Sequence, residues 1–266
     1  MSQLAATTST DQALVISGLT RRFGGVTALN GVSLGVALGE TRALIGPNGS
    51  GKSTLINCVS AVDRWDEGTV TLGGAPIKGR DPVGAARRGI SRTFQTLRLF
   101  DEMTVLENVM VAMHHARGYG LFSAITLGPR FRKAENRMRH EARELLALTG
   151  VERDAERQAG TLPYGHRRLV EIARSLALKP TLLLLDEPAA GLNDTETARL
   201  AELVRRIARP DLSILVVEHN MEFVTSVASQ VTVLDNGNII AEGTPAEVRE
   251  HPEVLRAYLG SSEDDK

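Results

Sequence analysis

The nonapeptide Gly46-Pro47-Asn48-Gly49-Ser50-Gly51-Lys52-Ser53-Thr54 fits the pattern G-x-x-x-x-G-K-[ST], in which backbone amides and a lysine bind phosphate. Residues 41–45 before it are short and apolar enough for a buried strand, and residues 55–59 after it can begin a helix. The glycines allow a tight turn that points several N–H groups at one anion, and the helix N-terminus adds partial positive charge. The motif therefore predicts a nucleotide site in which Lys52 reaches the β- and γ-phosphates and the Ser53 hydroxyl ligates Mg²⁺.

The bulk properties are those of a globular chain that has no general affinity for nucleic acid. Its 266 residues suit one large domain or a core with a subdomain, and its net charge is −1. Cys58 is the only cysteine, which excludes a disulfide within the chain and fits a reducing compartment; its apolar neighbours favour a core position over a reactive one. No apolar run approaches the ~18 residues that span a bilayer. We therefore expect any membrane contact to be made through another protein.

Hydrophobic periodicity divides the chain into an α/β core and an inserted helical segment. The expected divisions are a flexible tail at 1–12, the first segment of a nucleotide-binding core with an antiparallel β subdomain at 13–96, a helical subdomain at 97–165, the second segment of the core at 166–260, and a flexible tail at 261–266. The N-terminal tail is polar and lacks the charged and apolar regions of a signal peptide, and residues 261–266 are likewise polar.

Individual elements follow from local patterns. Strands are expected at 13–23, 26–36, 67–74 (entering a Gly-Gly turn), 181–185 and 213–217, and a hairpin with an Asn-Gly turn is expected at 234–239. Helices are expected at 134–149, 168–178 and 244–259, and another after the capping box of Thr104 and Glu107. A glycine-containing break is expected at 118–129. The strands at 181–185 and 213–217 are almost continuously apolar, which is typical of a parallel sheet buried on both faces. The basic residues between 130 and 143 fit a solvated helix face, with a docking surface for an acidic partner as the alternative.

Two carboxylates end an apolar run in Leu182-Leu183-Leu184-Leu185-Asp186-Glu187. A carboxylate at the C-terminal end of a strand beside a phosphate-binding loop can hold Mg²⁺ directly or through water, and we assign this role to Asp186. Glu187 is then placed to polarise a water molecule in line with the γ-phosphate. On its own, such an acid pair could equally be a solvated turn; the phosphate-binding motif favours the catalytic interpretation.

The pentapeptide Leu162-Pro163-Tyr164-Gly165-His166 lies just upstream of this strand, where the ATP-binding subunits of ABC transporters carry their signature loop. The chain resembles that family over about residues 13–260, with its motifs in order. The resemblance implies an α/β fold: a P-loop NTPase core of the ABC ATPase type with an antiparallel β subdomain and an inserted α-helical subdomain. It also implies that the cofactors are ATP and Mg²⁺.

The same resemblance assigns roles to individual residues. It implies that Phe23 stacks on adenine and that residues 46–54 form the Walker A loop. It implies that Gln95 senses the metal and the water and borders the permease groove, and that Asp186 and Glu187 are the Walker B carboxylate and the catalytic base. It further implies that residues 190–193 form the D-loop and that His219 contacts the γ-phosphate. Ser53, Gln95 and Asp186 are thus the expected metal ligands. Gly165, with the helix N-terminus behind it, can bind an anion across a subunit interface.

Two positions depart from the general family pattern. Pro163 replaces the serine of the usual Leu-Ser-Gly-Gly-Gln signature, which removes a hydroxyl and an N–H, and Asn193 replaces the aspartate of the D-loop. Both departures resemble the ATPases of branched-chain amino-acid uptake systems, as do the Arg92-Thr93-Phe94-Gln95 segment and the C-terminal residues 254–260.

This resemblance implies an ATP-hydrolysing importer subunit on the cytoplasmic face of the cell membrane. Its expected partners are integral-membrane permease subunits, a second ABC ATPase subunit (identical or, preferably, a paralogue) and, indirectly, a substrate-binding protein, with no nucleic acid. The alternatives are an ATPase of a lipid or lipopolysaccharide exporter, a soluble non-transport ABC ATPase, and a non-hydrolytic regulatory subunit. The last is suggested only by Pro163 and Asn193, and Lys52, Glu187 and His219 argue against it.

Overall fold

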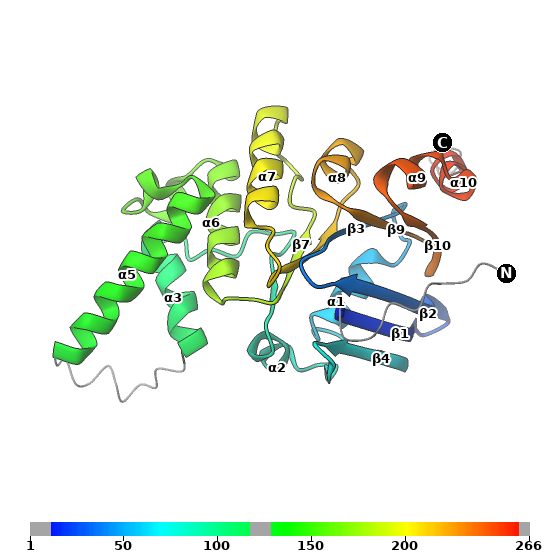
Figure 1. The fold of residues 1–266 in the computed structure, drawn as a ribbon, viewed down its shortest axis with the longest axis horizontal. Coiled ribbons are helices and arrows are strands. Elements are labelled where there is room, and N and C mark those ends of the chain that lie inside the picture. Colours follow the sequence, from blue (N-terminus) through cyan, green and yellow to red (C-terminus); the bar gives the residue numbers. More distant parts are fainter. Residues whose placement is uncertain (1–11, 118–128, 261–266) are drawn as a thin grey trace.

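The computed structural model describes residues 12–117 and 129–260, which form two β-sheets with helices around and beside them (Figure 1). The expected tails at 1–12 and 261–266, and the expected break at 118–129, lie outside the described residues except for Gln12 and Pro129, and Pro129 is helical. Gln12, which the sequence assigns to the tail, is the first residue of strand β1 (Gln12–Phe23).

The first sheet is antiparallel and is built from the N-terminal region of the chain. Its strand order is β2-β1-β4-β5, where β2 is Val26–Ala37, β4 is Glu67–Leu72 and β5 is Ala75–Pro76. Gly73 and Gly74 connect β4 to β5 with φ angles of 54° and 76°, a left-handed conformation that glycine adopts without steric cost. The predicted Gly-Gly turn is therefore confirmed.

The second sheet contains the strand that precedes the phosphate-binding motif. Its order is β10-β9-β3-β8-β7-β6, with bounds β3 Thr41–Ile45, β6 Ile90–Arg92, β7 Leu182–Asp186, β8 Ser213–Val217, β9 Gln230–Asp235 and β10 Asn238–Gly243. All neighbours pair in parallel except β9 and β10, which form the predicted Asn-Gly hairpin. Every residue of β7 and β8 is buried, as their apolar sequences predict. The carboxyl ends of β3, β7 and β8 consequently meet at one edge of the sheet.

Helices cover both faces of this sheet. Helix α1 (Lys52–Val59) packs through Leu55, Ile56 and Val59 into the cluster that joins the two sheets. Helices α7 (Asp194–Ile207) and α8 (Met221–Val227) bury the other face, and the short helix α2 (Pro82–Arg87) precedes β6.

The C-terminal helix predicted at 244–259 is in fact two helices, α9 (Pro245–Glu250) and α10 (Pro252–Gly260). His251, at the break, has an extended backbone with φ −70° and ψ 125°. A proline disfavours helical geometry in the residue before it and lacks an N–H of its own, so Pro252 ends one helix and starts the next.

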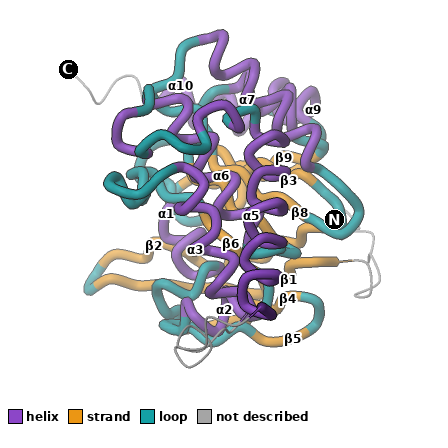
Figure 2. Tube along the Cα trace, turned by 90° about the vertical axis from the view of Figure 1, so that its left-hand side faces the viewer, coloured by secondary structure: helices purple, strands orange, loops and turns teal. Residues whose placement is uncertain are grey.

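The helical subdomain lies beside the sheets (Figures 1 and 2). It comprises α3 (Val105–Arg117), α5 (Pro129–Thr149), α6 (Tyr164–Ala177) and the 3-10 turns η1 (Glu152–Asp154) and η2 (Ala159–Thr161). The capping box is confirmed: the Thr104 N–H donates to Glu107 Oε2 at 2.8 Å, and the Glu107 N–H donates to Thr104 Oγ1 at 3.2 Å. Helix α5 begins five residues before the predicted start.

Helix α6 begins at Tyr164, four residues before the predicted start at Arg168. Pro163 has φ −55° and ψ 151° and occupies the N-cap, so the helix can begin directly after it. The expected boundary at 165/166 thus falls inside α6. One face of α6 packs into the cluster with α3 and α5, and the other packs against β7 and α7, so the helix connects the helical subdomain to the core.

Candidate functional site

The phosphate-binding motif forms the turn between β3 and α1, as the sequence predicts. Gly46, Gly49 and Gly51 have φ angles of 150°, 78° and 107°. A Cβ atom on Gly46 would collide with the carbonyl oxygen of Leu234, so only glycine fits there. The β9–β10 hairpin also supports the loop, because the Gly237 N–H donates to the Ser50 carbonyl at 2.9 Å.

Lys52 lies inside this loop. Its Nζ atom donates to the carbonyl oxygens of Gly46 at 2.8 Å and Pro47 at 2.7 Å, and the residue is 9 % exposed. Burial lowers the pKa of Lys52, and the negative charge of Glu187 partly opposes that shift. The loop that would surround a phosphate therefore holds the Lys52 ammonium group in position.

The two predicted carboxylates stand at the end of β7. Asp186 is 7 % exposed, whereas Glu187 is half-buried. Glu187 has a φ of 45°, a left-handed conformation that costs a non-glycine residue free energy. Its N–H donates to the Val217 carbonyl at the end of β8, at 2.9 Å. The strand ends thus hold the backbone of Glu187 in place.

Gln95 and His219 lie near this pair. The Gln95 Nε2 atom donates to Glu187 Oε2 at 3.1 Å, so the structure brings together two residues that are 92 positions apart. His219 follows β8, and its side chain is 66 % exposed. The preceding residue, Glu218, is 1 % exposed and accepts N–H bonds from His219 at 3.0 Å and from Ala189 at 2.8 Å. Glu218 therefore ties the His219 backbone to the turn after Glu187.

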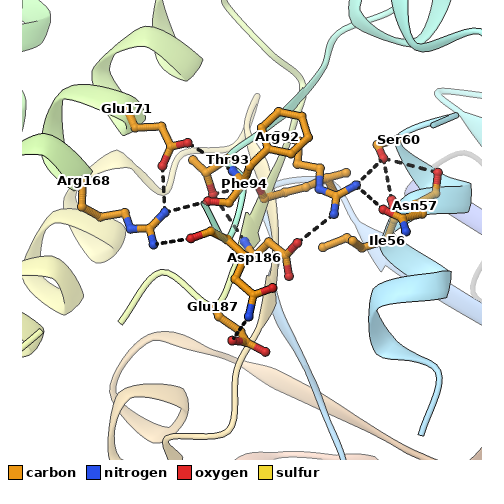
Figure 3. Close-up of polar contacts among 12 residues, drawn as sticks. Ile56, Asn57, Ser60, Arg92, Thr93, Phe94, Arg168, Glu171, Asp186 and Glu187 are labelled. Carbon is orange, nitrogen blue, oxygen red and sulfur yellow. Dashed lines mark hydrogen bonds and ion pairs between the residues drawn. The ribbon is translucent and has the colours of Figure 1, made fainter. Parts of the chain in front are cut away.

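Sequence reasoning missed the role of Glu218. It also missed the largely buried Arg92 and the fully buried Arg168, which Figure 3 shows with their partners. Arg168 is 0 % exposed and donates to the carbonyl oxygens of Phe94 at 2.8 Å and Gln95 at 3.3 Å. It also donates to Glu171 Oε2 at 2.8 Å. Helix α6 thereby holds the backbone on either side of the Phe94–Gln95 peptide. The available signal was an arginine on the apolar face of a predicted helix.

The remaining predicted residues lie apart from this group. Phe23 ends β1, is 47 % exposed, and has the Arg21 guanidinium carbon 4.2 Å from its ring centre. Gly165 lies in the first turn of α6, where a Cβ atom would collide with the Glu196 carboxylate of α7. No hydrogen bond or ion pair of the described residues joins Phe23 or Gly165 to Lys52 or Glu187.

The donor atoms fit Mg²⁺. Ser53, Gln95 and Asp186 offer a hydroxyl, an amide and a carboxylate, and Mg²⁺ prefers oxygen ligands. In residues 12–117 and 129–260 no three His, Cys, Asp or Glu side chains cluster as a metal site. A hydroxyl, an amide and a carboxylate suit an ion that is otherwise held by the phosphates of a nucleotide and by water.

Comparison with known sequences points to transporter ATPases. Residues 29–190 match the ABC transporter family, and residues 238–264 match the family described as branched-chain amino acid ATP-binding cassette transporter. The chain is 43 % identical to the high-affinity branched-chain amino acid transport ATP-binding protein LivG of Salmonella typhimurium, over 94 % of this chain and 98 % of that protein. It is 40 % identical to BraF of Pseudomonas aeruginosa, with the same coverage and the same description.

Solved structures agree with the sequence comparison. An ATP-binding cassette of an ABC transporter in its ADP conformation is 33 % identical, with a TM-score of 0.81 over 94 % of this chain and 99 % of that one. A dimeric bacterial ABC transporter cassette is 25 % identical, with a TM-score of 0.73 over 87 % and 98 %. Among the helices described here, none has the length and apolarity needed to cross a membrane.

Proposed function

The chain belongs to the ABC transporter family as an ATP-binding, ATP-hydrolysing subunit, and from this membership we propose that it drives uptake of branched-chain amino acids through a separate permease. One observation carries the proposed substrate class: two ATP-binding proteins named for high-affinity branched-chain amino acid transport align with 94 % of the chain at 40–43 % identity. The match of residues 238–264 to the corresponding C-terminal family supports it.

The site supports hydrolysis that depends on Mg²⁺. Ser53 and Asp186 would hold the ion, with Gln95 as a further oxygen donor. When bound, Mg²⁺ neutralises negative charge on the phosphates. Lys52 and the loop amides bind the β- and γ-phosphates. Glu187, fixed by Gln95 and by its own backbone, orients the attacking water and accepts its proton.

A second ATPase subunit would complete this site. By family analogy, Gly165 and the N-terminus of α6 face the nucleotide of the partner subunit, and His219 contacts the γ-phosphate. Pro163 leaves α6 with a free N-terminus, which can still attract an anion. The dimeric cassette among the structural relatives supports a paired arrangement. We propose a paralogue as the partner in preference to a second copy.

A groove between the core and the helical subdomain supports permease docking on the cytoplasmic face of a membrane. A cavity of about 290 Å³ lies there, and residues of α2, β6 and α6 line it together with Phe94 and Arg98. The Arg98 guanidinium carbon stands 4.2 Å from the Phe94 ring centre. A permease segment seated in this groove would touch the chain immediately before Gln95, so it could affect the position of Glu187.

The proposal is tested by capturing partners with the Glu187→Gln variant, ATP and Mg²⁺ from detergent-solubilised native membranes. We expect two polytopic permeases and a second ATPase, identified by mass spectrometry. The same complex, purified with the wild-type chain in place of Glu187→Gln and reconstituted in vesicles with its binding protein, should then accumulate radiolabelled leucine or isoleucine when ATP is supplied. Soluble partners alone would contradict the transporter proposal; permeases that move lipid and leave amino acids behind would support an exporter instead.

A further inference from the structure

Arg92, the last residue of β6, connects three elements of the nucleotide site. Its Nη2 atom donates to Asp186 Oδ2 at 2.8 Å, and its Nη1 atom donates to Asn57 Oδ1 at 2.7 Å and to Ser60 Oγ at 3.0 Å (Figure 3). Asn57 lies on α1 and Ser60 is its C-cap, so the phosphate-binding helix and the Walker B carboxylate share one guanidinium.

The ion pair is largely shielded from solvent. The side chains of Arg92 and Asp186 are 10 % and 9 % exposed. Arg92 Nε is buried without a hydrogen-bond partner in the region of the chain that the structure describes. The side chain therefore leaves one donor unsatisfied while it holds Asp186, which is costly unless the charge pairing compensates.

Electrostatics gives this pairing a consequence for the metal. The guanidinium neutralises the carboxylate through Oδ2, and its positive charge also repels any divalent cation that Asp186 would hold. Arg92 further lines the groove that we assign to the permease, so one side chain reaches from that groove to the metal ligand. A change in the groove that moves Arg92 would therefore also change the charge environment of Asp186.

We propose that Arg92 is a positioning residue that balances the charge of Asp186 and thereby limits how much Mg²⁺ contributes to nucleotide affinity. This inference rests on the Mg²⁺–nucleotide site proposed above, but not on the transported substrate.

The experiment measures the dissociation constant of a fluorescent ADP analogue from the purified chain, with Mg²⁺ and with EDTA. The ratio of the two constants is the metal enhancement, and it needs no turnover. In Arg92→Met the cation becomes the main charge partner of Asp186, so the enhancement should rise at least about fivefold. In Arg92→Lys, a point charge that cannot bridge all three acceptors, it should rise about twofold.

Two controls separate this role from a merely structural one. Arg98→Met removes a neighbouring arginine that lines the same groove but has no contact with Asp186, and its enhancement should stay at the wild-type value. In an Asp186→Asn background, Arg92→Met should raise the enhancement far less than it does in the wild-type background, because the carboxylate charge is gone and only the direct repulsion by the guanidinium is relieved. Cooperative thermal unfolding verifies that each variant is folded.

Any of the following outcomes would overturn the proposal. The first is an enhancement in Arg92→Met equal to that of the wild type. The second is an equal rise in Arg98→Met or in the Asp186→Asn background. If the methionine variant does not fold, Arg92→Lys decides, and an unchanged ratio there counts against the role. An enhancement near one in both the wild type and Arg92→Met would remove the metal site itself, and with it this inference, while leaving the partner-capture test to judge transport.

Discussion

Glu187 is the residue whose geometry defines the chemistry most closely. Its backbone is held at a φ of 45°, and its carboxylate accepts a hydrogen bond from Gln95. Glu187→Gln keeps the size and removes the base, so we expect ATP to bind while hydrolysis slows by ~10²-fold or more. A steady-state phosphate-release assay with a parallel binding titration checks this. Glu202→Gln, an exposed change on α7, is the control, and near-normal turnover in Glu187→Gln would exclude the assigned role.

Cys58 shows burial acting on a single side chain. It lies on α1 at 0 % exposure, and burial, with a further contribution from Asp63, raises its pKa from 9.0 to about 12. At pH 8 only about one thiol in ten thousand would be ionised, so maleimide should label the native chain far more slowly than the unfolded chain. Equal labelling rates would contradict the buried position.

The same shift predicts a dependence of stability on alkaline pH. The unfolded thiol ionises near its ordinary value and the folded one only near 12, so the unfolded state loses its proton first. The stability contributed by the neutral thiol is complete below about pH 9 and declines between about pH 9 and 12. Urea unfolding of the wild type and Cys58→Ala across this range measures the difference, and parallel curves would refute it.

At the scale of elements, Asn193 is the N-cap of α7, a role that an aspartate at this position could fill as well. Asn193 caps α7, because its Oδ1 atom accepts a hydrogen bond from the Glu196 N–H at 3.0 Å. The Asn193 N–H in turn donates to Glu196 Oε2 at 3.1 Å. Aspartate caps as well as asparagine does, whereas alanine cannot. Asn193→Ala should therefore cost about 1 kcal/mol, or roughly 2–4 °C in melting temperature, and Asn193→Asp almost nothing. Equal losses in both variants, measured by thermal denaturation, would contradict a capping role.

Elements with a strong local signal were predictable from the sequence. The phosphate-binding turn, the apolar strands β7 and β8, and the Asn-Gly hairpin each depend on residues within one short stretch. The buried arginines were not predictable in their roles. Arg92 binds Asp186, which is 94 positions away in the sequence, and Arg168 binds the Phe94 carbonyl, which is 74 positions away. Since every residue has a backbone carbonyl, the sequence does not indicate which one an arginine will bind. The start of α6 was missed because Tyr164 and Gly165 are weak helix formers that follow a proline.

At the scale of the whole molecule, α6 determines how the subdomains are joined. Val170 and Ala173 pack into the helical cluster, while Ile172 and Leu176 pack into the core around β7 and α7. Arg168, on the same helix, holds the backbone that leads from β6 into the helical subdomain. The helical subdomain and the core are therefore joined through α6, which contributes side chains to both hydrophobic clusters and hydrogen bonds to the segment after β6.

This shared helix predicts that the molecule unfolds in one transition. Trp65 is the only tryptophan, and it packs against the cluster between the two sheets, so its fluorescence reports on the core. Far-UV circular dichroism reports mainly on the helices. In urea, both signals should give the same midpoint, as two-state unfolding requires. Leu176→Ala, which weakens the core side of α6, should lower both midpoints together, because a cavity there destabilises one cooperative unit. A helical signal that is lost at lower urea than the Trp65 signal would show instead that the helical subdomain unfolds on its own.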